Sequence, residues 1–190
     1  MEEAKPIIRK IIAKKEDSMS DQVSSRKPFG LPTNAIVAKS GNVKLRSSKG
    51  YGFFKRSLVP KGTELIDKWN VMVSKTSYDH AGQPDKEGKR RVFSVIDILP
   101  PKTICTETYL IAGTFNTKKE AMNLITYLKT RFVRFLISQL TVSHDITKDK
   151  FEFIPVQSFK ESWTDNKLYK KYKLTKKEID FIESKIHPME

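Results

Sequence analysis

The chain has 190 residues, a charged fraction of 31% and a formal net charge of +14 at pH 7. A charge of this size restricts the partners to polyanions, namely DNA, RNA or an acidic membrane surface. Of these the membrane is the weakest candidate, because no apolar run approaches the ~20 residues that a membrane span requires. The single cysteine, Cys105, excludes an internal disulfide and, with no signal-peptide pattern after Met1, predicts a cytoplasmic protein.

Strands are predicted across the middle of the chain, after one helix. Isoleucines at helical spacing predict a short amphipathic helix over residues 3–15, ahead of a polar linker. Beyond residue 34, short apolar segments alternate with turns rich in Gly, Ser and Asn, which is typical of β-strands. The predicted strands are residues 35–38, 43–47, 52–55, 68–75, 92–99 and 108–115, with a long loop over residues 78–91.

Helices are predicted in the last third of the chain. A Thr-x-x-Glu capping box at residues 117–120 begins an apolar stripe that continues to residue 140 and predicts one long helix. Residues 151–155 predict a returning strand. Two shorter helices are predicted at residues 162–172 and 175–186, the second of them behind another capping box.

This order of elements predicts an α+β fold. We expect a mixed or mainly antiparallel sheet over about residues 35–115, with the long helix and the C-terminal helices packed on one side. Three parts are predicted: an N-terminal helix and linker at 1–21, a β-rich DNA-recognition part at 22–116, and a helical scaffold with one returning strand at 117–190.

A stretch without acidic residues carries much of the net charge. From Gln22 to Thr63 there is no Asp and no Glu, but there are nine Lys and Arg residues, together with several aromatic ones. Charges of one sign repel one another and destabilise a compact state, so such a stretch is typical of a surface that meets a polyanion. Because it is also rich in aromatic residues, it predicts a folded surface that binds nucleic acid.

Strand alternation would place Lys44 and Arg46 on one face of a hairpin, and Tyr51, between two glycines, is positioned to stack on a base. The candidate DNA-binding residues are Arg26, Lys27, Lys44, Arg46, Lys49, Tyr51, Lys55, Arg56, Arg90 and Arg91. Arginine binds guanine O6 and N7 through two hydrogen bonds, so Arg46, Arg56 and Arg90 are the predicted base readers. The cations predicted to bind phosphates are Lys27, Lys44, Lys49, Lys55 and Arg91.

Two other functions remain open at this point. Asp85, Glu87 and Lys89 resemble a metal-nuclease signature, although they are crowded into one Gly- and Pro-containing loop, so a small Mg²⁺-dependent restriction endonuclease is the second hypothesis. The third is a module that docks a subunit of a restriction-modification complex, with the charge serving solubility. No metal-ligand spacing, cofactor loop or nucleophile–base pattern occurs in the sequence, so no catalytic or metal-binding residue is predicted.

Several separated blocks resemble a known family. They are SSRKPFGLPTN at residues 24–34, ETYL at 107–110, TRFVRFL at 130–136, and the run from Trp163 to Glu183. Together they resemble the C-terminal region of bacterial adenine-specific DNA methyltransferases of restriction-modification systems, where fused restriction-modification enzymes carry a target-recognition domain. The resemblance covers roughly residues 24–189.

The resemblance implies a module that binds double-stranded DNA and selects its sequence. The partner it implies is a methyltransferase catalytic domain of the same polypeptide or complex, with S-adenosylmethionine as the cofactor of the parent enzyme and Mg²⁺ as a second candidate. The catalytic and cofactor motifs of the family are absent from this chain, which implies a fragment with no cofactor and no catalysis of its own. By the same analogy, the β-rich part from residue 35 to about 99 would face the DNA groove.

Overall fold

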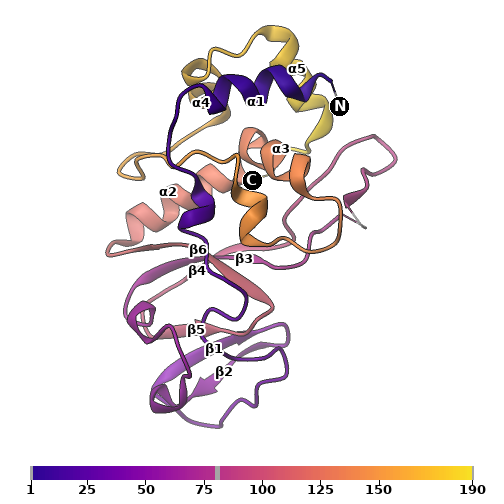
Figure 1. Cartoon of the computed structure of the whole chain (residues 1–190). Helices are drawn as coiled ribbons and strands as arrows, with labels where there is room; N and C mark the ends of the chain where they lie inside the picture. Colours follow the sequence, from indigo (N-terminus) through magenta and orange to yellow (C-terminus); the bar gives the residue numbers. More distant parts are fainter. Residues whose placement is uncertain (1, 80–81, 190) are drawn as a thin grey trace.

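A three-stranded antiparallel sheet at the centre of the molecule separates two hydrophobic cores (Figure 1). The computed structural model describes residues 2–79 and 82–189. The central strands are β3 (Trp69–Ser74), β4 (Ile96–Leu99) and β6 (Tyr109–Phe115), and they pair in the order β4-β3-β6. Helices cover one face of this sheet, and a second, smaller sheet lies beyond the other (Figure 1).

The central strands are apolar on both faces because both faces are covered. Along β6, Leu110 and Ala112 belong to the core under the helices, whereas Tyr109 and Ile111 belong to the core shared with the smaller sheet. Successive side chains of a strand point to opposite faces, so a strand between two cores is a nearly continuous apolar run. The central sheet therefore joins two separately packed parts of the molecule.

The smaller sheet lies at the lower end of Figure 1 and contains a β-hairpin. Its strands are β1 (Val43–Ser47), β2 (Gly50–Phe54) and β5 (Thr103–Cys105), in the order β2-β1-β5. A two-residue turn, Ser48 and Lys49, joins β1 to the antiparallel β2, while β5 pairs with β1 in parallel. The sequence analysis did not predict β5, which is only three residues long.

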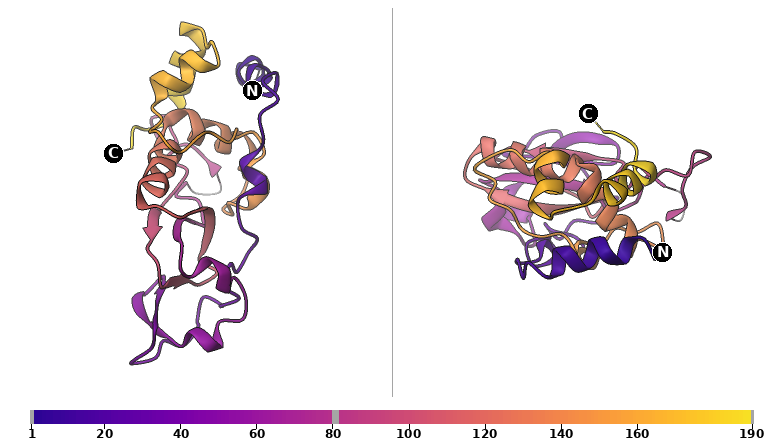
Figure 2. Two further views of the ribbon diagram at one scale, coloured as in Figure 1. Left: turned by 90° about the vertical axis from the view of Figure 1, so that its left-hand side faces the viewer. Right: turned by 90° about the horizontal axis from the view of Figure 1, so that it is seen from above.

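The α-helices lie at the opposite end of the molecule, and α1 runs beside α4 and α5 there (Figures 1 and 2). They are α1 (Ala4–Ile12), α2 (Lys118–Lys129), α3 (Arg131–Leu140), α4 (Asp165–Lys171) and α5 (Lys176–Lys185), with short 3₁₀ helices at Met19–Asp21, Arg56–Leu58, Thr63–Leu65 and Lys148–Phe151. Helix α2 lies directly on the central sheet at Gly113. A Cβ atom at that position would lie 2.5 Å from Leu124 Cδ2, so any larger residue there requires the Leu124 side chain to move.

The prediction of one long helix after residue 117 is wrong, because the helix is interrupted at Thr130. Thr130 has extended backbone angles, and its hydroxyl accepts a hydrogen bond from Val133 N, so it is the N-cap of α3. The next two backbone N–H groups, of Arg131 and Phe132, donate to the Asp165 carboxylate at 3.1 and 2.8 Å. A carboxylate from a distant segment therefore accepts hydrogen bonds from the free backbone N–H groups at the start of α3. The apolar stripe alone does not indicate this helix start.

Two predicted strands are absent. Residues 35–38 are paired only through Ala38, whose N–H donates to Phe53 O at 2.8 Å. Residues 151–155, the predicted returning strand, form turns after a 3₁₀ helix, and Pro155 makes a single bridge with Ser18. Proline lacks the N–H that a continued ladder needs, which limits pairing at this position.

The predicted strand at residues 92–99 is shorter than expected and begins at Ile96. Val92 has a φ angle of 73°, which lies in the left-handed region and interrupts an extended conformation. The loop predicted at residues 78–91 includes residues 80 and 81, which lie outside the described residues.

Aromatic side chains join the C-terminal helices to α3. The rings of Phe132 and Tyr172 are stacked, with centroids 5.1 Å apart and an interplanar angle of 11°. The Tyr172 hydroxyl donates to Glu16 Oε2 at 2.6 Å, and Tyr169 is buried beside it. Trp163 is half-buried, with the Lys171 ammonium 5.2 Å from its ring centroid. These contacts fasten the last helices to the rest of the fold.

The α+β fold class is confirmed, with antiparallel pairing in the central sheet and mixed pairing in the smaller one. The three-part division of the chain stays a prediction, and the core under the helices takes side chains from all three parts, for example Ile7, Leu110 and Phe132. Among the described residues, no helix is both long enough and apolar enough to cross a membrane.

Candidate nucleic-acid interface

The outward side of the hairpin carries a mixed aromatic and cationic surface. On β1, Val43, Leu45 and Ser47 are buried, so the intervening Lys44 and Arg46 point the other way. The strand register pairs Lys44 with Phe53 and Arg46 with Tyr51, which places these four side chains on one face of the sheet. We call this surface, made by Lys44, Arg46, Tyr51 and Phe53, the hairpin face.

The two aromatic side chains of the hairpin face are largely exposed. Tyr51 is 58% exposed and Phe53 is 42% exposed. The opposite side of β2 is packed, because Val37 lies so close to Gly52 that a Cβ there would be 2.6 Å from Val37 Cβ. The exposure of the two rings is therefore not the result of a poorly packed strand. Tyr51 and Phe53 form a neighbouring pair of exposed rings, and adjacent exposed apolar side chains are typical of binding surfaces.

Arg46 is held by aromatic rings rather than by a carboxylate. Its guanidinium carbon lies 5.0 Å from the centroid of Tyr51 and 5.6 Å from that of Tyr109, distances typical of cation–π contacts. The Nε atom is buried, and no partner for it exists in the described part of the chain. Two rings thus orient the guanidinium without neutralising its charge.

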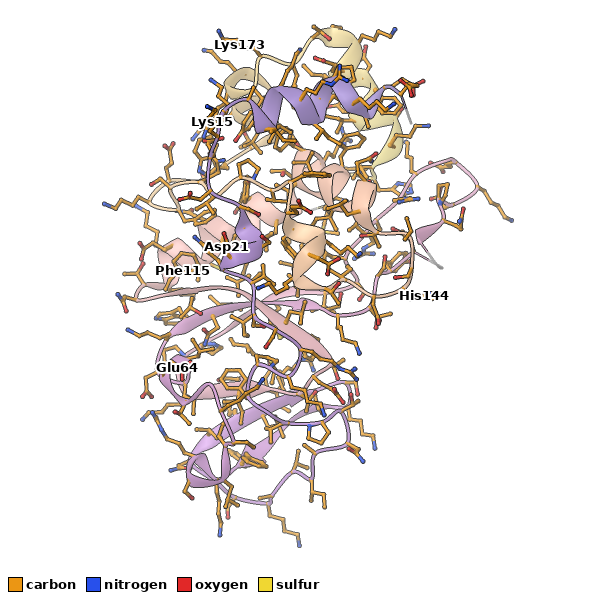
Figure 3. The ribbon with its side chains drawn as sticks, viewed as in Figure 1. Lys15, Asp21, Glu64, Phe115, His144 and Lys173 are labelled. Carbon is orange, nitrogen blue, oxygen red and sulfur yellow. The ribbon has the colours of Figure 1, made fainter. Side chains whose placement is uncertain are left out.

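Lysines surround the hairpin face. Lys44 lies on it, Lys49 is in the turn between β1 and β2, and Lys55 follows directly after β2. All three side chains are exposed, and within residues 2–79 and 82–189 none of them makes an ion pair or a side-chain hydrogen bond. Lys15 and Lys173, by contrast, lie at the helical end of the molecule, while Glu64, the first acidic residue after the acid-free stretch, lies on the lower half (Figure 3).

Arg56, predicted to read bases, is instead engaged with Asp67. Its Nη1 and Nη2 atoms donate to the two carboxylate oxygens at 2.8 and 2.6 Å. These hydrogen bonds raise the pKa of Arg56 and lower the pKa of Asp67. Because both Nη atoms of Arg56 already donate hydrogen bonds to Asp67, Arg56 is not free to bind a base edge in this structure. Nothing near Arg56 in the sequence indicated this partner, which is 11 residues away.

Arg26 and Lys27 also face a carboxylate, that of Glu107. Arg26 Nε lies 2.9 Å and Lys27 Nζ 3.7 Å from Glu107 Oε2. Desolvation raises the pKa of Glu107, but the N–H of Thr33 and the two cations outweigh it, so the net shift is downward. Both cations remain partly exposed, at 65% for Arg26 and 42% for Lys27, and each lies beside a compensating charge.

Arg90 and Arg91 are not brought to the hairpin face. They lie next to the helices, where Arg90 Nη1 donates to Ser138 O at 2.9 Å. The guanidinium of Arg91 lies 4.8 Å from the centroid of Tyr78, an exposed ring. The predicted site residues therefore fall into separate groups. One group lies on or next to the hairpin, Arg56 and the Arg26–Lys27 pair each lie beside a carboxylate, and Arg90 and Arg91 lie near the helices.

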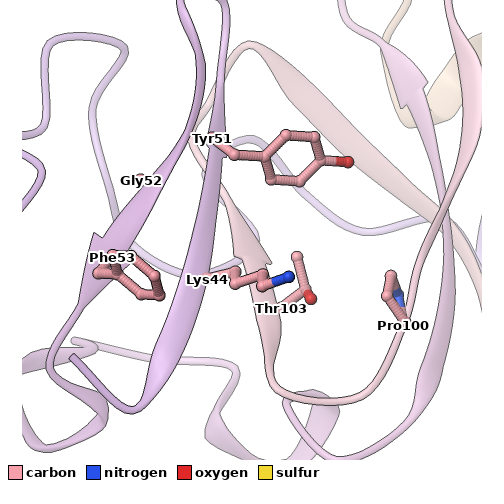
Figure 4. A pocket seen from close by; sticks show the side chains of 6 residues that line it. All are labelled: Lys44, Tyr51, Gly52, Phe53, Pro100 and Thr103. Carbon is pink, nitrogen blue, oxygen red and sulfur yellow. The ribbon is translucent and has the colours of Figure 1, made fainter. Parts of the chain in front are cut away.

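A cavity of about 430 Å³ opens on the hairpin face (Figure 4). It is lined by Lys44, Tyr51, Gly52, Phe53, Pro100 and Thr103. Sequence reasoning missed Phe53, Pro100 and Thr103 as site residues. For Phe53 a signal existed, because it has the same strand parity as Tyr51. For the other two there was none, since the parallel pairing of β5 with β1 brings Thr103 here and Pro100 lies in the short connection before β5.

The nuclease-like loop shows its carboxylates engaged with separate partners. Asp85 Oδ1 accepts hydrogen bonds from the N–H groups of Glu87 and Lys89 at 2.9 and 3.0 Å, and Oδ2 lies 2.5 Å from His187 Nε2. The bond to His187 and the two backbone bonds lower the pKa of Asp85. The Glu87 side chain is 70% exposed and lies near Lys89. Over the ranges that the structure describes, no group of three or more His, Cys, Asp or Glu side chains is arranged to hold a metal ion.

The single cysteine lies on β5, beside Arg46 of β1. Cys105 is fully buried at the end of β5, and burial raises the pKa of its thiol far above the ordinary value. A thiol of this kind is a packing group rather than a nucleophile.

Comparison of the chain with models of protein families, with curated proteins and with solved structures gives no match.

Proposed function

We propose that this chain is a non-catalytic, sequence-specific double-stranded DNA-binding module, the target-recognition domain of a restriction-modification adenine-N6 DNA methyltransferase. The observation that carries the DNA-binding part is the hairpin face, where Arg46 and Lys44 stand unneutralised beside two exposed aromatic rings. The restriction-modification context rests on the sequence resemblance of the blocks at residues 24–34, 130–136 and 163–183.

The hairpin has the shape that the proposal requires. A two-stranded β-ribbon fits the major groove of B-DNA, and β1 and β2 are two five-residue strands at the free lower end of the molecule (Figure 1). In this arrangement Lys49 and Lys55, at the turn and at the end of β2, bind phosphates and set the register. Arg46, oriented by Tyr51 and Tyr109, binds a base edge.

Binding of the chain to a random-sequence duplex, measured against salt concentration, tests the proposal. Four to six phosphate contacts by cations of the acid-free stretch give a slope of log K against log salt of about −4 to −5. A slope near zero would overturn DNA binding. Cleavage of plasmid that requires Mg²⁺ and Asp85 would establish the nuclease in its place, and subunit capture unaffected by charge reversal at Arg46 would establish the docking module.

The Arg56–Asp67 pair gives a second test, one in which binding improves. The substitution Asp67→Asn removes a negative charge beside the hairpin and leaves one neutral amide oxygen in place of the two carboxylate oxygens that now accept from Arg56. We expect the affinity for duplex DNA to rise about fivefold at about 0.1 M salt, since one more phosphate contact is worth just under tenfold there. The double variant Arg56→Gln/Asp67→Asn, titrated in parallel, returns the affinity close to the wild-type value. A weaker complex with Asp67→Asn alone would contradict this reading of the pair.

A further inference from the structure

The cavity on the hairpin face combines three properties on a small area. Its lining is mainly apolar, it is flanked by the exposed rings of Tyr51 and Phe53, and the Lys44 ammonium group stands within it. Figure 4 shows Tyr51 and Lys44 extending from neighbouring strands toward Pro100, across the hollow between the hairpin and the start of β5. The hollow lies on the surface already proposed to meet DNA.

The polar groups of the lining are few and unpaired. Within residues 2–79 and 82–189, neither the Lys44 ammonium nor the Thr103 hydroxyl makes a hydrogen bond to another side chain or to the backbone. The register places Lys44 directly beside Thr103 on β5 and beside Phe53 on β2. One cation, one hydroxyl and two aromatic rings thus converge on one apolar hollow, which is the usual composition of a site for a flat, partly polar ligand.

We propose that this cavity receives one unpaired nucleobase of the bound DNA, stacked on Tyr51 or Phe53, with Lys44 contacting the phosphate of the same nucleotide and the buried Thr103 forming part of the cavity wall. The inference rests on the proposed function and deepens it, since it names the part of the DNA that this face takes up. Protein sites for unstacked bases use aromatic side chains for stacking and a cation for the backbone. A paired base is inaccessible to the cavity, because both of its faces are covered by neighbouring bases.

The proposal predicts a preference for DNA that already contains an unpaired base. Unstacking and unpairing a base costs free energy, and a single-base bulge in the duplex removes most of that cost before binding. Stacking of a base on an aromatic side chain is worth enough to change affinity about fivefold or more. We therefore expect the chain to bind a duplex with one bulged thymine about tenfold more tightly than the same duplex fully paired.

The experiment compares the two duplexes by fluorescence anisotropy for the wild type and three variants. Phe53→Ala and Tyr51→Ala are expected to lower the preference for the bulged duplex to less than about twofold. Tyr78→Ala is the matched control, because Tyr78 is 57% exposed and stacks on an arginine at 4.8 Å, as Tyr51 does at 5.0 Å, but outside the cavity. This control is expected to keep the full preference.

A chemical measurement separates insertion from general affinity. Permanganate oxidises an unstacked thymine, so the bulged thymine is reactive in free DNA and is expected to be protected in the wild-type complex but not in the Phe53→Ala complex. Equal affinity for both duplexes without protection overturns the cavity proposal and leaves the proposed function standing. Failure to bind either duplex overturns the proposed function itself.

Discussion

Replacing the four cations of the hairpin by glutamine, in the variant Lys44→Gln/Arg46→Gln/Lys49→Gln/Lys55→Gln, is expected to lower the affinity for duplex DNA about 10³-fold at about 0.1 M salt. Each phosphate contact contributes about 0.9 to the salt slope, so each is worth just under tenfold at that concentration. The slope itself is expected to fall in magnitude by about 3, because Lys44, Lys49 and Lys55 contact phosphates whereas Arg46 contacts a base edge. The three lysines are exposed and Arg46 has no carboxylate partner, so the variant retains the fold.

A charge-matched control distinguishes a local surface from the effect of net charge. The variant Lys148→Gln/Lys160→Gln/Lys173→Gln/Lys177→Gln also lowers the net charge of +14 by four, but at exposed positions among or near the helices. Net charge attracts a protein to DNA regardless of where the charges lie on the surface, whereas a direct contact depends on the position of each charge. We expect the control to bind within about threefold of the wild type. An equal loss in both variants would show that the hairpin face is not the binding surface.

Arg134→Met is expected to lower the free energy of unfolding by about 3 kcal/mol. Arg134 has no exposed surface, and it donates from Nε to Lys129 O at 3.1 Å, from Nη1 to Arg91 O at 3.3 Å and from Nη2 to His187 O at 2.7 Å. Methionine fills similar space but leaves these three carbonyl groups without their donor, at about 1 kcal/mol each. Through these hydrogen bonds the Arg134 side chain connects the end of α2, the loop before Val92 and the C-terminal segment.

The charge of Arg134 persists in this buried position. Burial lowers its pKa to about 10, which still lies well above neutral pH, so the three carbonyl groups bind a cation. Urea unfolding followed by circular dichroism measures the loss. Arg131→Met is the control: Arg131 is half-buried, its Nη1 lies 3.3 Å from Glu183 Oε2, and its loss is expected to cost less than about 1 kcal/mol. Equal destabilisation by the two substitutions would contradict the role of Arg134 in connecting the three segments.

Local patterns predicted much of the fold. Alternation located the hairpin and the side of it that carries Lys44 and Arg46, because one strand face is packed and the other is not. The capping box of Thr175 and Glu178 located the start of α5, and both of its reciprocal hydrogen bonds are present. These features depend on neighbours within a few residues, so the sequence carries them directly.

Features that depend on distant partners were not predictable in this way. The break at Thr130 depends on Asp165, 35 residues later, and the loss of Arg56 as a free cation depends on the orientation of Asp67. The cavity depends on Thr103, which reaches Lys44 only through parallel strand pairing. An acid-free stretch therefore predicted a cationic surface, but it did not predict which cations the fold neutralises.

The separation of the two cores by the central sheet has an evolutionary consequence. Lys44 and Phe53 are exposed on the face opposite the buried Val43 and Leu45, so an exchange of either side chain leaves the sheet beneath in place, whereas Arg46 packs against the core residue Tyr109. Under the proposed function, substitutions at Lys44 and Phe53 therefore change ligand preference while the stability of the scaffold stays constant. On that proposal, the residues that select the ligand and the residues that hold the fold lie in different parts of the chain.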